Sequence, residues 1–135
     1  MISSDVASAY LQEFTCDKVY NIAGPEVGPK WEVKVIIIVK ALYELKTSGG
    51  MWNLKLADIL RNIGFRPCQA DFDLWLCPWV DQYKYIAVYT DDLFLFTKNS
   101  EGILELLREV FHYELRGVGT PEYYNGVYVG YDKEK

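Results

Sequence analysis

The chain has 135 residues, half of them hydrophobic, and a formal net charge of −5 at pH 7. This length fits one domain with its own core, and the apolar share excludes a chain that is disordered by composition. The acidic balance excludes a protein that depends on general attraction to phosphates, because such proteins are usually basic. The longest aliphatic run, residues 35–39, is far too short to cross a bilayer.

Apolar spacing and turn residues predict an α+β fold, with helices packed on one face of an antiparallel sheet. The clearest helix has apolar residues at helical spacing from Trp52 to Ile63, and Gly64 is well placed to end it. In the first half of the chain we expect a strand at residues 1–4, a short helix at 7–14, and strands at 19–23 and 33–39. A helical stretch interrupted at 48–50 follows, and then the clear helix. In the second half we expect strands at 72–77, 83–89 and 93–97, a helix from 99 or 100 to 112, and a strand at 123–131.

Two adjacent acids, Asp91 and Asp92, stand between two apolar runs at the crest of a predicted hairpin. Two-residue hairpin turns favour Asn-Gly or Asp-Gly, so turn chemistry explains this stretch badly. Neighbouring carboxylates repel each other, and a divalent cation removes that cost. The alternative is a solvated turn whose acids only limit aggregation.

Asp5 follows the first predicted strand, and in an antiparallel sheet that strand end would lie beside the hairpin crest. Three carboxylates would then meet at one place. Asp5 also suits the N-cap of the short helix that follows, and the two roles are compatible. Because the first strand is so short, we expect it to anchor Asp5 poorly.

Several blocks of sequence occur together in an order typical of one family. The segment 5–11, DVASAYL, resembles D-V-x-x-A-[FY]-L, and the segment 40–46, KALYELK, resembles K-A-L-Y-G-L-K. Gly64-Phe65 with a later Ala70-Asp71 matches G-F-x-x-x-x-A-D, and the segment 89–93, YTDDL, resembles Y-V-D-D-[IL]. Along essentially its whole length the chain resembles the reverse transcriptase of copia-type LTR retrotransposons, an RNA-directed DNA polymerase.

The resemblance implies a right-hand polymerase palm with truncated fingers, and it assigns roles to individual residues. Asp5, Asp91 and Asp92 would be the catalytic acids. Asp5 and Asp91 would bind two Mg²⁺ or Mn²⁺ ions with help from the backbone carbonyl of Val6, and Asp92 would support the metal geometry.

The nucleotide-binding residues implied by the family are Tyr10 and Lys46. Tyr10 occupies the position of the aromatic steric gate, which disfavours a ribose 2′-hydroxyl, and Lys46 would lie near the template or the nucleotide. The implied partners are an RNA or DNA template with its primer and deoxynucleoside triphosphates, but no membrane. Missing polymerase segments or a second copy of the chain are further partners that the resemblance leaves open.

The resemblance also predicts organisation and location. We expect residues 1–135 to form a single partial reverse transcriptase domain, with the palm and adjoining segments but without upstream fingers, a full thumb or a ribonuclease H domain. We expect an intracellular protein, cytoplasmic or in retrotransposon particles, and not a secreted one.

Some positions depart from the family pattern. Glu44 stands where the family block has glycine, and residues 47–50 read TSGG where many members have Q-A-P-R. Thr90 replaces the usual valine. An added negative charge and a missing arginine oppose triphosphate binding, so we expect impaired activity of the isolated chain. The alternative is a non-catalytic relic, or a repurposed interaction module that keeps the palm fold.

Overall fold

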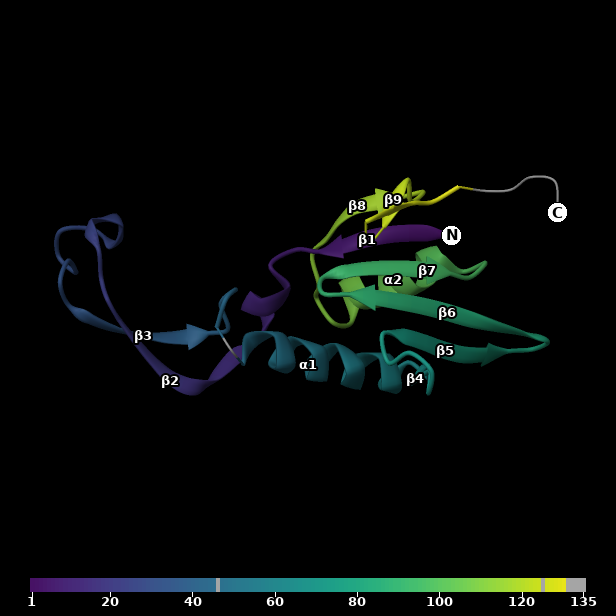
Figure 1. Ribbon diagram of the computed structural model, residues 1–135, viewed down its shortest axis with the longest axis horizontal. Coiled ribbons are helices and arrows are strands. Elements are labelled where there is room, and N and C mark those ends of the chain that lie inside the picture. Colours follow the sequence, from purple (N-terminus) through teal and green to yellow (C-terminus); the bar gives the residue numbers. More distant parts are fainter. Residues whose placement is uncertain (46, 125, 131–135) are drawn as a thin grey trace. The chain divides into compact units, whose positions relative to one another are not determined.

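A computed structural model describes residues 1–45, 47–124 and 126–130. They form two compact units, one built from Met1–Ala7 together with the described residues from Ala57 onward, the other from Ser8–Leu56. The first unit contains a large antiparallel sheet and the second a two-stranded ribbon (Figure 1). The α+β prediction is therefore confirmed. Within the described ranges, no helix is long and apolar enough to cross a membrane.

The first unit is built on a six-stranded sheet in the order β4-β5-β6-β7-β1-β8. β1 pairs with β7 on one side and β8 on the other, so the first strand of the chain is an inner strand of the sheet (Figure 1). The expectation that β1 anchors Asp5 poorly is therefore wrong. The strands of this sheet are β1 (Ile2–Val6), β4 (Arg66–Pro67), β5 (Leu74–Trp79), β6 (Gln82–Tyr89), β7 (Asp92–Phe96) and β8 (Leu115–Gly119).

The two faces of this sheet differ in burial, because successive side chains of a strand point to opposite faces. One face holds the core residues Leu93 and Leu95, whose side chains are almost wholly buried. The helix α2 (Ser100–Glu109) lies behind the sheet in Figure 1 and buries Ile103, Leu104 and Leu107. The other face carries Asp5 opposite Asp92 in the strand register.

The helix α1 (Ser48–Asn62) ends as the sequence predicts. Gly64 has a φ of +93°, a conformation that glycine adopts without steric cost. Its N–H donates to the carbonyl of Arg61, and the N–H of Phe65 donates to the carbonyl of Leu60. These two bonds satisfy carbonyls that the helix end would leave without partners.

The start of α1 corrects the sequence prediction. Ser48, Gly49 and Gly50 do not interrupt a longer helix but form its first three residues. The preceding segment forms a turn in which the N–H of Leu45 donates to the carbonyl of Leu42. Glu44 in that turn has a φ of +71°, which a right-handed helix does not accommodate.

The second unit contains a ribbon of β2 (Phe14–Ile22) and β3 (Val35–Lys40), with a short 3-10 turn, η2 (Pro25–Val27), between the strands. The helix expected at residues 7–14 is instead a 3-10 turn, η1 (Ala9–Gln12). One face of the ribbon is apolar and more than half exposed, and it comprises Tyr20, Ile22, Val35, Ile37 and Val39.

The end of the chain also differs from the prediction. β8 pairs with β1 although the sequence analysis predicts no strand there. The single strand expected at 123–131 is two short strands, β9 (Tyr123–Tyr124) and β10 (Val127–Tyr128), and its last residue lies outside the described residues. Gly126, between them, has a φ of +80°, a conformation typical of glycine in tight hairpin turns.

Candidate metal centre

Backbone pairing brings Asp5 to the crest of the β6–β7 hairpin. Asp5 lies directly opposite Asp92 in the antiparallel register of β1 and β7. The N–H of Val6 donates a 2.9 Å hydrogen bond to the carbonyl oxygen of Asp91, which ties the turn to β1. The alternative role of Asp5 as a helix N-cap is wrong, since Ser8 holds that position before η1.

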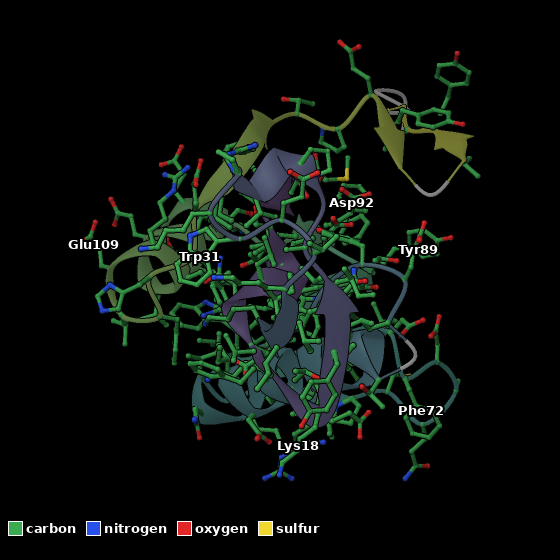
Figure 2. All side chains as sticks on the ribbon, turned by 90° about the vertical axis from the view of Figure 1, so that its left-hand side faces the viewer. Lys18, Trp31, Phe72, Tyr89, Asp92 and Glu109 are labelled. Carbon is green, nitrogen blue, oxygen red and sulfur yellow. The ribbon has the colours of Figure 1, made fainter. Side chains whose placement is uncertain are left out.

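The hairpin crest is a two-residue turn of unusual composition. Tyr89 pairs with Asp92, so Thr90 and Asp91 alone connect the strands (Tyr89 and Asp92 are labelled in Figure 2). Of these two residues only Thr90 has a positive φ, +55°, which fits a type II′ turn. Positive φ is uncommon for a β-branched residue and costs on the order of 1–3 kcal/mol. The paired strands and the bond from Val6 hold the turn in this conformation.

The three acids form one cluster. A carboxylate oxygen from each of Asp5, Asp91 and Asp92 can be chosen so that all three lie within 4.8 Å of one another. Asp5 and Asp91 are half-buried, and Asp92 is exposed. The cluster therefore has a protein side, formed by the sheet, and a side open to solvent.

Partial burial and mutual repulsion disfavour the charged forms in this cluster. Burial raises the pKa of Asp5 above its usual value of 3.8, the charge of Asp91 raises it further, and Arg116 lowers it in part. Burial also raises the pKa of Asp92, with smaller contributions from the charges of Asp91 and Asp5. The metal-free cluster thus carries an electrostatic cost at neutral pH.

The donor set fits a hard divalent cation. Mg²⁺ prefers carboxylate oxygens, is bound through one or two of them, and keeps coordination sites for water or phosphate. Asp5, Asp91 and Asp92 supply such oxygens within the reach of a shared ion, and Asp92 is exposed to solvent. Val6 lies next to Asp5 with its side chain fully buried, and the role of its carbonyl as a ligand stays a prediction.

The raised pKa values predict how pH changes stability. The folded chain binds more protons than the unfolded chain at pH values between the unfolded pKa of 3.8 and the raised folded values of Asp5 and Asp92. Stability from these groups therefore increases as pH falls through that window. We expect Asp92→Asn to melt at a higher temperature than the wild type at neutral pH, with an advantage that disappears in acid. Circular dichroism melting of both proteins checks this.

Mg²⁺ is expected to stabilise the wild type more than Asp92→Asn. At five times its Kd, Mg²⁺ should stabilise the wild type by about 1 kcal/mol at neutral pH and Asp92→Asn by less. Asp81→Asn, which changes an exposed acid in the β5–β6 turn, is the matched control and should respond like the wild type. Equal stabilisation of all three proteins would contradict a cation at this cluster.

Sequence reasoning missed one charged neighbour. Arg116 on β8 lies opposite Asp5 in the β1–β8 register and lowers the pKa of Asp5. Its guanidinium Nε and Nη2 also donate to one carboxylate oxygen of Glu114, Oε1, at 3.1 and 2.9 Å. No strand was predicted at residues 115–119, so the sequence did not indicate that Arg116 lies opposite Asp5.

Tyr10, one of the two predicted nucleotide-binding residues, does not belong to the unit that carries the acids. Tyr10 lies on η1 in the second unit, where its ring packs on that of Tyr43 with centroids 4.4 Å apart. Lys46 lies outside the described residues. The side chain of Glu44 is exposed. Its positive φ falls where the family block has glycine, so the backbone keeps a glycine-like conformation without the glycine.

Comparison with known families identifies the chain. The family described as "Reverse transcriptase (RNA-dependent DNA polymerase)" matches residues 1–134. The chain therefore belongs to this reverse transcriptase family.

Related proteins point to the copia type. The chain is 27% identical over 122 residues to the Transposon Ty1-DR4 Gag-Pol polyprotein of Saccharomyces cerevisiae, and equally similar to the TyH3 Gag-Pol polyprotein of that yeast. The Ty1-MR1 Gag-Pol polyprotein is 26% identical over the same length. Each match covers 87% of this chain and 7% of the relative. These matches confirm the copia-type resemblance, and no solved structure matches the chain.

Proposed function

We propose that this chain forms the palm of a copia-type reverse transcriptase and that its acidic cluster binds two divalent cations for nucleotide transfer to a primer 3′-hydroxyl. One observation carries the proposal. In a chain of this family, an inner strand and a hairpin crest bring oxygens of Asp5, Asp91 and Asp92 within 4.8 Å of one another. The electrostatic cost of that arrangement disappears when a cation binds.

Asp5 and Asp91 would be the shared ligands of both ions, Mg²⁺ or Mn²⁺, with the carbonyl of Val6 as a further donor. Asp92 would support the geometry of the metal site and add its negative charge to the cluster. When bound, the cations stabilise charge on the attacking and leaving oxygens of an in-line phosphoryl displacement. The pairing of β1 with β7 holds Asp5 opposite Asp92, so the proposed ligands would need little reorganisation when substrate binds.

Two residues implied by the family resemblance would bind the nucleotide. Tyr10 would exclude a ribose 2′-hydroxyl, and Lys46 would contribute a positive charge near the triphosphate or template. The partners are then a primed RNA or DNA template and deoxynucleoside triphosphates. We place this activity inside the cell, in the cytoplasm or in retrotransposon particles.

We expect the 135-residue chain alone to extend primers slowly. Its net charge of −5 repels a polyanionic substrate, and Glu44 adds a negative charge two residues before Lys46, which is proposed to lie near the triphosphate or template. Weak substrate binding lowers activity without any defect in the acidic cluster.

Primer extension tests the proposal. The chain, alone and fused to the fingers of a family member, is incubated with a primed RNA template, deoxynucleotides and either Mg²⁺, Mn²⁺ or Ca²⁺. We expect incorporation with Mg²⁺ and Mn²⁺, little with Ca²⁺, and none with Asp91→Asn. No metal-dependent incorporation by the fused wild type would contradict the enzymatic proposal.

One observation favours a second candidate, an interaction module that keeps the palm fold. The ribbon of β2 and β3 exposes an apolar face of five large side chains. Exposed contiguous apolar surface is typical of binding sites. For such a module, Asp91→Asn would leave function intact, whereas a charge on the ribbon, as in Ile37→Lys, would remove it.

A further inference from the structure

Tyr10 and Tyr43 form an aromatic pair within the second unit. Their ring centroids are 4.4 Å apart and the ring planes are inclined by 30°. This is close to the offset stacking that aromatic side chains prefer. Tyr43 is 47% exposed, so its ring packs on Tyr10 at the surface and contributes little to the core.

Short contacts hold the backbone segments of this pair together. The N–H of Glu13 donates to the carbonyl of Tyr10, and the carbonyl of Glu13 accepts from the N–H of Ala41 at 2.9 Å. The carboxylate of Glu13 also contacts the ammonium of Lys55 on α1 at 3.1 Å. These contacts join the residue after η1 to the residue after β3 and to α1.

The position of Tyr43 depends on a type II turn. The N–H of Leu45 donates to the carbonyl of Leu42, and the third residue of this four-residue turn, Glu44, has a φ of +71°. Positive φ at the third residue but not at the second, Tyr43, is the pattern of a type II turn, which places Tyr43 at its outer corner. The same backbone conformation that strains Glu44 therefore presents Tyr43 to Tyr10.

Gly49 borders the hydroxyl end of Tyr10. A methyl group on Gly49 would lie 3.5 Å from the Tyr10 hydroxyl oxygen, an ordinary van der Waals contact. A methyl group on Gly50 would meet no atom within 4 Å. Tyr10 is thus supported on one ring face by Tyr43 and has space for one methyl group at its hydroxyl.

We propose that Tyr43 is a positioning residue for Tyr10, and that the pair, together with the space at Gly49, determines how strongly the site prefers a deoxyribose over a ribose. This inference rests on the proposed function, in which Tyr10 faces the nucleotide sugar. A ring rejects an extra hydroxyl only if it cannot move aside. Packing against Tyr43 restricts that movement, and filling the space at Gly49 restricts it further.

The test compares dATP with ATP in two measurements on the same proteins. Titration of chain carrying ¹³C-labelled tyrosine, in the presence of Ca²⁺, gives the Kd of each nucleotide and reports the Tyr10 ring. Primer extension by the fused protein with Mg²⁺ gives kcat/KM for each nucleotide. The variants are Tyr43→Leu, Tyr43→Phe, Gly49→Ala and Gly50→Ala.

We expect Tyr43→Leu to shift the Tyr10 ring resonance and to reduce the preference for dATP about tenfold. Tyr43→Phe, which keeps the ring, should retain the wild-type preference. Gly49→Ala should maintain or increase the preference, whereas Gly50→Ala should leave it unchanged. The two glycine variants remove the same kind of residue from the first turn of α1, so only contact with Tyr10 distinguishes them.

The outcomes separate this inference from the proposed function. If the wild type prefers dATP and Tyr43→Leu keeps that preference, the positioning role is overturned while the polymerase proposal stands. An unchanged Tyr10 resonance in Tyr43→Leu also overturns it. If the fused wild type neither binds nor incorporates either nucleotide, the proposed function fails and this inference fails with it.

Discussion

Asp5→Asn is expected to lower metal-dependent nucleotide incorporation by at least about a hundredfold. Asp91→Asn should have a similar effect, because each of these residues supplies an oxygen to the same cluster. An amide at either position keeps the shape of the side chain but removes the negative charge that a cation requires. The measurement is kcat/KM for a deoxynucleotide in primer extension with Mg²⁺.

The double variant distinguishes a shared site from two separate ones. Residues that act as one unit show strongly non-additive losses, so the double variant should be little worse than either single variant. Asp81→Asn, in the β5–β6 turn, should retain wild-type activity. Losses that simply multiply, or a loss in Asp81→Asn, would contradict a common cation site.

Glu44→Gly is expected to stabilise the chain and to improve nucleotide use. A left-handed backbone conformation costs an L-residue roughly 1–2 kcal/mol, and glycine removes that cost. The gain in the free energy of unfolding should be about 1 kcal/mol, since glycine also makes the unfolded chain more flexible. For a chain of this size the melting temperature should rise by about 4 °C.

Two further variants separate conformation from charge. Glu44→Gln removes the charge but not the positive φ, so it should improve deoxynucleotide binding without stabilising the fold. Glu32→Gly alters another exposed glutamate whose φ is not positive, and it should not stabilise the chain. We expect KM for deoxynucleotides to fall about tenfold in Glu44→Gly, because removing a like charge near a triphosphate favours binding. A destabilised Glu44→Gly protein would contradict the turn geometry.

Local pattern predicted much of the fold. The apolar spacing from Trp52 to Ile63 and the glycine at position 64 predicted α1 and its end, because helical periodicity and positive φ are encoded by neighbouring residues. The same reasoning failed before Ser48, where the local pattern predicted a helix but the chain forms a turn. β8 was also missed, because its alternating burial is weak and its pairing partner, β1, lies at the other end of the chain.

The sequence by itself determined the family, the α+β class and the identity of the three acids, because residue type and order carry that information. Only the tertiary structure decided that Asp5 meets Asp91 and Asp92, that Arg116 lies beside them, and that Thr90 and Glu44 adopt positive φ. The physical reason is that strand register and turn conformation depend on pairing between distant segments. No pattern within a single segment specifies which strands will lie next to each other.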